Sequence, residues 1–220
     1  MKYFKQTINQ LFLIVTLSLL ANSAHANLIV NGSFEGNTFA DNTWRLFNED
    51  DVLGWQSPNR IELWRSPFLG VRPDDGQNLL ELNSTTNATL YQNFTTLAGQ
   101  WYHLTFAYRA RASVNEVFMV DLIDNTTNSG ILNANFDDHI VGQWSQASLR
   151  FQAASNETQL LFTATRGTRR SVGNLLDDVN IQAQSFARLS ATQVPTPNTL
   201  LFFALPLIAL VVRNAKRNKA

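Results

Sequence analysis

Large apolar side chains alternate with smaller or polar ones from Tyr102 to Arg109, and this period of two limits the fold more than any other feature. In an extended chain every second side chain points the same way, so the pattern is typical of a half-buried strand. The alternation recurs around 149–153 and 160–164, with clusters of Gly, Asn, Asp, Ser and Pro between the segments. Residues 27–184 show no sustained helical period. The sequence therefore predicts an all-β domain.

Further short apolar segments bring the expected number of strands to eight or nine. Strands of this length and spacing predict an antiparallel β-sandwich of the jelly-roll type, with one face of each sheet buried. A domain of about 155 residues buries close to 70% of its unfolded surface, so it needs no disulfide to fold. The additional segments are 28–30, 61–64, 79–82, 90–94, 117–122 and 175–181.

Charge and composition exclude several functions. The chain has no cysteine, which excludes disulfides, thiolate zinc sites and a cysteine nucleophile. All 17 acidic residues lie between Glu35 and Asp178, whereas six of the 17 basic residues lie at the two ends. The 11 remaining arginines leave the middle of the chain with a formal charge of −6. A negative central region argues against a nucleic-acid partner.

The first 26 residues have the pattern of a secretory signal peptide. Lys2 and Lys5 precede an apolar run, and the segment closes with Ala24–His25–Ala26, which places small residues at the two positions that signal peptidase reads. We expect cleavage before Asn27. An uncleaved N-terminal anchor is the alternative.

The last 26 residues, 195–220, have the pattern of a membrane anchor. After a polar linker at 185–194, Pro195 and Pro197 precede an unbroken apolar stretch at 200–212. Four cations then follow at the end of the chain, as the positive-inside rule expects of a cytoplasmic C-terminus. A buried core helix, the alternative, does not account for these cations. The pattern predicts a transmembrane helix with residues 27–184 outside the cytoplasm.

This tail resembles the sorting signal of bacterial PEP-CTERM proteins. The resemblance covers the Val-Pro-Thr-Pro motif, the apolar helix and the basic end, with Thr196 in place of the usual Glu. It implies an exosortase as processing partner and a Gram-negative source. The product would be anchored in the inner membrane or released to an exopolysaccharide-rich surface, and Thr196 puts the processing step in question.

The central region is similar to the galactose-binding-like jelly rolls that include many carbohydrate-binding modules. The resemblance implies a non-catalytic carbohydrate-binding domain with a structural calcium ion held by Glu35 and Asp177. Six segments carry it in order: 27–35, Gly54–Trp55, 61–64, 75–77 with 80–83, 102–106 and 176–179.

Residue chemistry is compatible with that calcium site. Ca²⁺ takes six to eight oxygen ligands, which two carboxylates and nearby backbone carbonyls can supply. Asp177 also shares its strand parity with Val179 and Ile181, which predicts a charged group on an apolar face. Such a group needs a metal or hydrogen-bond donors. The alternative is a buried Asp that accepts backbone N–H or arginine hydrogen bonds.

Sugar binding requires exposed aromatic faces with a few polar groups beside them. Trp44 and Trp64 are the candidates for such faces, because an arginine follows each of them. Burial of all five tryptophans is the alternative, and Trp55 and Trp144 are expected in the core. The candidate polar contacts are Arg65, Arg109 and Arg111, together with Glu62 and Glu81.

An enzyme is the less favoured class. No nucleophile-elbow, zinc-protease or P-loop motif occurs, and the paired aspartates lie in segments typical of turns. We therefore expect an exported, non-catalytic module that binds carbohydrate or exopolysaccharide matrix. The alternatives are a structural or adhesion protein that contacts other proteins and a glycan-active enzyme.

Overall fold

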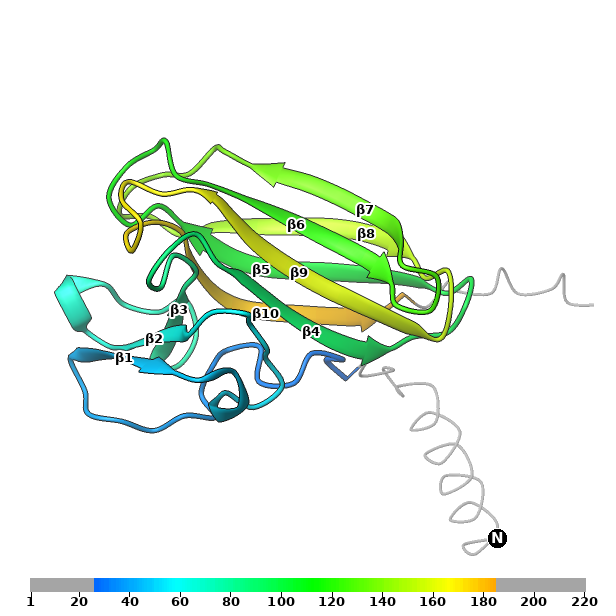
Figure 1. Cartoon of the computed structure of the whole chain (residues 1–220), viewed down its shortest axis with the longest axis horizontal. Coiled ribbons are helices and arrows are strands. Elements are labelled where there is room, and N and C mark those ends of the chain that lie inside the picture. The colour runs from blue at the N-terminus through cyan, green and yellow to red at the C-terminus, as the bar shows by residue number, and fades with distance from the viewer. Residues whose placement is uncertain (1–25, 185–220) are drawn as a thin grey trace, which may run out of the picture. The chain divides into compact units, whose positions relative to one another are not determined.

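The computed structural model describes residues 26–184, which form two antiparallel sheets packed face to face (Figure 1). One sheet has six strands in the order β1-β2-β3-β10-β5-β8, and the other has four in the order β4-β9-β6-β7. The strands are β1 (Thr43–Phe47), β2 (Ile61–Arg65), β3 (Asn78–Glu81), β4 (Thr89–Thr95), β5 (Trp101–Arg109), β6 (Val117–Asp124), β7 (Ser129–Phe136), β8 (Ser145–Gln152), β9 (Glu157–Arg166) and β10 (Leu175–Ala183). Two short 3₁₀ turns, η1 (Glu49–Asp51) and η2 (Phe68–Gly70), lie in loops.

Strands β3 to β10 form a jelly roll. Their order is β3-β10-β5-β8 in one sheet and β4-β9-β6-β7 in the other, so the chain passes from sheet to sheet as in two nested Greek keys. Strands β1 and β2 extend the first sheet beyond β3. The prediction of an all-β antiparallel sandwich is confirmed.

The core lies between the sheets and follows the expected alternation. On β5 the side chains of Tyr102, Leu104, Phe106 and Tyr108 are buried in the main apolar cluster. Phe162 from β9 packs edge-on against Phe106, with ring centroids 5.1 Å apart. Burial of these large apolar faces is the main stabilising contribution to the sandwich.

Three details of the sequence prediction are wrong. Residues 28–30 are not a strand, although Leu28 N–H donates to the carbonyl of Ile181 at 2.8 Å. Strands β1 and β7 were not expected, and both lie at the edge of a sheet with many exposed residues. β1 has apolar side chains on both faces, which hides its period, whereas the alternation of Leu132, Ala134 and Phe136 in β7 is present in the sequence and was missed.

The third error concerns β10, where a bulge between Asp177 and Asn180 shifts the register. Asp178 adopts a φ of 45° there. As a result Leu176, not Asp177, shares the main core with Val179. An extra residue in a bulge reverses the side-chain parity that simple alternation assumes.

The predictions for the chain ends lie outside the described residues: the signal peptide up to residue 25, the linker, Pro195, Pro197 and the membrane helix. Within residues 26–184, no helix is long and apolar enough to span a bilayer.

Candidate binding site

The candidate site lies on the outer face of the six-stranded sheet, the face turned away from the main core. Strand register places Leu46, Glu62, Glu81, Leu175 and Arg109 in one row across β1, β2, β3, β10 and β5. Directly opposite residues on antiparallel strands share a face, so these side chains are neighbours. The two carboxylates therefore lie side by side.

The loop between β2 and β3 folds over part of this face. Phe68 of η2 packs edge-on against Trp64, with ring centroids 4.9 Å apart. Trp64 belongs to a second apolar cluster with Val71 and Leu79, and it is 1% exposed. The expectation that Trp64 offers an exposed stacking face is wrong, because the loop covers it.

Trp44 lies directly opposite Trp64 in the β1–β2 register and remains uncovered. It is 46% exposed. An edge strand without a covering loop leaves the indole accessible on the same face of the sheet. Trp44 is therefore a tryptophan of this face that a ligand can reach.

Arg111 follows β5, and the buried carboxylate of Glu116 fixes its backbone. Glu116 accepts hydrogen bonds from the N–H groups of Arg111 (2.7 Å), Ala112 (3.0 Å) and Ser113 (3.1 Å), and from Oγ1 of Thr168 (2.6 Å). A carboxylate that accepts several N–H bonds orders a loop as a helix cap does. Glu116 thus sets the direction in which the Arg111 side chain leaves the chain.

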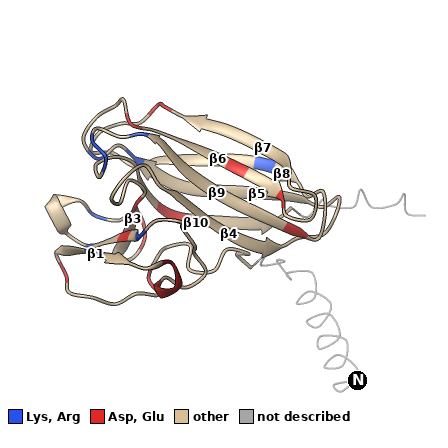
Figure 2. Cartoon of the chain, in the orientation of Figure 1, with Lys and Arg blue, Asp and Glu red and all other residues tan. Residues whose placement is uncertain are grey.

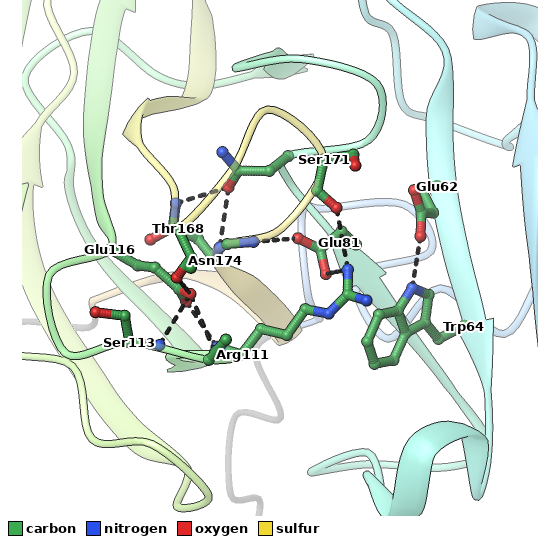
Figure 3. A network of polar contacts seen from close by, with 12 residues as sticks. Glu62, Trp64, Glu81, Arg111, Ser113, Glu116, Thr168, Ser171 and Asn174 are labelled. Carbon is green, nitrogen blue, oxygen red and sulfur yellow. Dashed lines mark hydrogen bonds and ion pairs between the residues drawn. The ribbon is translucent and has the colours of Figure 1, made fainter.

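The guanidinium of Arg111 lies between the carboxylate of Glu81 and the ring of Trp64 (Figure 3). Its Nη1 donates to Oε2 of Glu81 at 3.2 Å and to the carbonyl of Ser171 at 3.0 Å. Its Cζ lies 4.6 Å from the centroid of the Trp64 ring, a cation–π distance. The buried ring of Trp64 thus packs against the guanidinium of Arg111 and helps to hold it in place.

A cleft of about 440 Å³ opens beside this guanidinium. Trp44 and Leu46 from β1, Glu62 from β2 and Phe68 from η2 line one part of it. The other lining residues are Ser84, Thr85, Arg111, Ser171 and Val172. The cleft therefore combines an exposed indole with a guanidinium, a carboxyl group and hydroxyl groups.

Burial perturbs both carboxyl groups of the row. It raises the pKa of Glu62 to about 7, while the hydrogen bond from Trp64 Nε1 (2.8 Å) and the charge of Arg111 oppose the rise. Burial also raises the pKa of Glu81 well above its usual value, and Arg111 opposes this rise.

One positive charge balances one of these two carboxylates. Both oxygens of Glu81 accept N–H bonds, from Gly173 (2.7 Å) and from Arg111 (3.2 Å). Among residues 26–184, by contrast, no group donates to Oε2 of Glu62. Its pKa of about 7 leaves Glu62, which faces the cleft, partly protonated near neutral pH.

Arg65 and Arg109, two of the predicted contacts, do not line the cleft. Arg65 forms an ion pair with Asp41 at 2.6 Å and donates to Oδ1 of Asn78 at 3.1 Å. Arg109 lies over the ring of Trp144, with Cζ 5.6 Å from the centroid. Trp144 is half-buried beside the second cluster, and Trp55 is in the main core as expected. The structure thus brings together Trp44 and Arg111 of the predicted ligand set.

Glu35 and Asp177, the predicted calcium ligands, both bind backbone N–H groups of the loop before β3. Oε1 of Glu35 accepts from the N–H groups of Gln77 and Asn78, each at 2.6 Å. Oδ2 of Asp177 accepts from Asp74 (2.8 Å) and Asp75 (2.9 Å), and Oδ1 accepts from Asp178 (2.8 Å). These oxygens face hydrogen atoms rather than open space.

The contacts match the second of the two alternatives for Asp177, a buried carboxylate held by backbone donors. Burial nevertheless raises the pKa of Asp177 to about 8, against these three hydrogen bonds. Among the described residues, no group of three or more His, Cys, Asp and Glu side chains is placed to hold a metal ion. These contacts do not supply the six to eight oxygen ligands that Ca²⁺ takes. Calcium binding stays a prediction.

Three residues that hold the backbone beside the cleft in place were not identified from the sequence: Asn83, Gly173 and Asn174. Asn83 Oδ1 accepts from both the N–H and the Nδ2 of Asn174, each at 2.9 Å, and this holds the chain after Ser171 in place. Gly173 lies so close to the Asn83 amide that a Cβ atom would overlap it. A contact between residues about 90 positions apart leaves no local pattern, so a single sequence does not reveal it.

Residues 27–182 match the protein family described as "Protein of unknown function (DUF642)". The chain belongs to the DUF642 family. The match spans the described jelly roll and the site residues above. It assigns the fold unit to a family without assigning a ligand.

Relatives of this DUF642 chain are segments of much larger proteins. It is 27% identical over 183 residues to the multifunctional-autoprocessing repeats-in-toxin of Vibrio cholerae serotype O1, and 26% identical over 168 residues to that of Vibrio vulnificus. The alignments cover 80% and 75% of this chain but 4% and 3% of the two toxins.

Solved structures with a similar arrangement include three described as carbohydrate-binding modules. "CBM4 structure and function" has a TM-score of 0.45 and 19% identity, covering 71% of this chain and 99% of that one. TmCBM61 in complex with beta-1,4-galactotriose has a TM-score of 0.49 and 12% identity, covering 72% of this chain and 99% of that one. "Family 16 Carbohydrate Binding Module-2" has a TM-score of 0.47 and 15% identity, covering 70% of this chain and 99% of that one. With TM-scores below 0.5, these similarities do not decide what the DUF642 domain binds.

Proposed function

We propose that the DUF642 domain of this chain binds carbohydrate in the cleft beside Trp44 and Arg111, without turning it over. One observation carries the proposal: the exposed indole of Trp44 lines the same cleft as the guanidinium of Arg111 and the carboxyl group of Glu62. Pyranose rings pack their C–H faces on aromatic rings, and a few convergent polar groups orient their hydroxyls. The cleft supplies both elements.

The same geometry argues against hydrolysis. Glycoside hydrolysis uses two carboxyl groups that flank the scissile bond. Glu62 lines the cleft, whereas Glu81 is buried beneath it with N–H donors on both oxygens. A single carboxyl group at the cleft suits a hydrogen-bonding role better than a catalytic pair.

Affinity electrophoresis of the full chain in mild detergent, with soluble polysaccharides in the gel, tests the binding function. Replacement of Trp44 by alanine is expected to weaken retardation by about tenfold or more, because the sugar loses its stacking surface. Trp101→Ala is the matched control, since Trp101 is a half-buried tryptophan of β5 that does not line the cleft. Equal binding by Trp44→Ala and the parent chain would refute this site.

Export is the second part of the proposal. The signal-like N-terminus and the apolar, basic tail support a domain that acts outside the cytoplasm, tethered through residues 195–220 or released by an exosortase-type enzyme. Fractionation of cells that express the chain tests this part, and recovery of the intact chain in the cytosol contradicts it. The two parts are independent.

A further inference from the structure

Arg111 also lines a second hollow, of about 390 Å³. Arg169 and Thr168, from the loop between β9 and β10, line this hollow as well. Unlike the first cleft, which contains Glu62, the second hollow has no acidic residue among its lining residues. Arg111 and Val172 line both spaces, so the two spaces adjoin.

Both arginines have donors to spare. Only Nη1 of Arg111 has acceptors among residues 26–184, which leaves Nε and Nη2 available. The side chain is 21% exposed and rests on Trp64, so little freedom is lost when it binds. Arg169 is exposed, and within the described part of the chain no acidic side chain pairs with it.

The backbone of Arg169 is held in place despite the exposure of its side chain. Its N–H donates to the carbonyl of Val172 at 3.2 Å, and the N–H of Val172 donates back at 3.2 Å. Arg166 ends β9 and Arg170 lies in the loop, and Figure 2 shows basic residues gathered where β9 passes into β10. A domain that is negative overall thus has a local positive region beside the cleft.

The ion pair with Glu81 offsets the charge of Arg111, so among residues 26–184 the uncompensated positive charge at the hollow is that of Arg169. Glu81 is matched by Nη1 of Arg111, and Glu116 is surrounded by three N–H groups and the hydroxyl of Thr168. Glu62 faces the first cleft. The free guanidinium nitrogens are the polar groups best placed to meet a ligand in the second hollow.

We propose that the hollow between Arg111 and Arg169 holds the negatively charged group of an acidic sugar, while an adjoining sugar ring packs on Trp44. This inference rests on the proposed carbohydrate-binding function and names the ligand class, an acidic polysaccharide. The recognised chemistry is an anionic oxygen group, which a uronate carboxylate or a sulfate ester supplies. Planar carboxylates match the paired donors of a guanidinium.

Affinity electrophoresis with matched polymers tests the hollow. The full chain in detergent is run with polygalacturonate and with the same polymer after reduction of its carboxyl groups, and with dextran sulfate and dextran. We expect each acidic polymer to bind at least fivefold more tightly than its neutral partner. The preference should shrink in 0.5 M salt, because salt screens exposed charges.

Arg169→Gln is expected to lower the preference for acidic polymer by about threefold to fivefold, the scale of an exposed ion pair, and to leave neutral binding unchanged. Arg170→Gln is the matched control, since it removes the same charge from the same loop outside the hollow. Equal losses in the two variants would overturn the inference in favour of diffuse attraction. An effect on polygalacturonate alone identifies carboxylate as the bound group, and an effect on dextran sulfate alone identifies sulfate.

The outcomes distinguish a failure of the acidic-sugar inference from a failure of the proposed carbohydrate-binding function. If the parent chain binds acidic and neutral polymers equally and Trp44→Ala weakens both, the acidic-sugar inference is wrong and the carbohydrate function stands. If the parent chain binds none of the four polymers, both proposals are overturned.

Discussion

Replacement of Arg111 by methionine removes the charge that balances the Glu62–Glu81 pair and keeps a long side chain over Trp64. At pH 8, Glu81 is then left as a buried carboxylate without a counter-ion, or has to hold a proton. Loss of one partner of a buried ion pair costs about 3–5 kcal/mol, and the partial exposure of Arg111 places this case near the lower end, about 3 kcal/mol.

At pH 5 the same substitution should cost about 1 kcal/mol. Glu62 and Glu81 have raised pKa values because they are buried, so both are largely protonated at that pH and need no cation. The remaining loss is the hydrogen bonds that the guanidinium donates to a neutral Glu81 and to the Ser171 carbonyl, together with the cation–π contact. The destabilisation should therefore grow with pH.

Urea unfolding followed by tryptophan fluorescence measures this difference. All five tryptophans lie between residues 44 and 144, so the signal reports on the sandwich rather than on the chain ends. Arg150→Met is the control, because Arg150 lies over the ring of Trp101, with its Cζ 5.5 Å from the centroid. Arg150 is exposed, and within residues 26–184 it forms no ion pair with a buried acid. An equal loss of stability at pH 5 and pH 8 for Arg111→Met would refute the charge-pair argument.

Two further predictions concern stability. The free energy of unfolding of the parent chain should fall as pH rises from 5 to 8. In the folded state Glu62 and Asp177 have pKa values of about 7 and 8, so they keep protons that the unfolded chain releases near pH 4. Rising stability over this range in urea titrations contradicts the prediction. Glu116→Gln should cost about 2–3 kcal/mol, because an amide cannot accept all four donors at the start of the Arg111 loop, whereas the exposed Glu157→Gln should change the unfolding midpoint little.

Sequence periodicity predicts those parts of the fold in which burial is one-sided. On β5 the alternation marks the core face correctly, because one face meets the other sheet and the other does not. It fails at Asp177, where the bulge reverses the parity, and at β1, where both faces carry apolar side chains. The alternation from Leu132 to Phe136 in β7 is present in the sequence, although it was not used to predict a strand. Period-two reasoning assumes an unbroken pleat.

The candidate site is less predictable than the fold. The sequence points to Trp44 and Arg111 by residue type, and the structure places both at one cleft. It points to Trp64 for the same reason, yet a loop that packs over the sheet buries that ring. Whether a tryptophan is a ligand platform or a support depends on such a cover, which has no signature in the residues around the tryptophan itself.

The cleft has walls of different origin. One belongs to the eight-stranded jelly roll and its β9–β10 loop, and the other belongs to β1 and β2, which pair with the jelly roll along β3. Under the proposed function, substitutions at outward positions of β1 change the choice of ligand without disturbing the nested Greek keys. Strands β1 and β2 are therefore the part of the domain to vary when engineering altered specificity, and a library of variants would begin at Trp44 and Leu46.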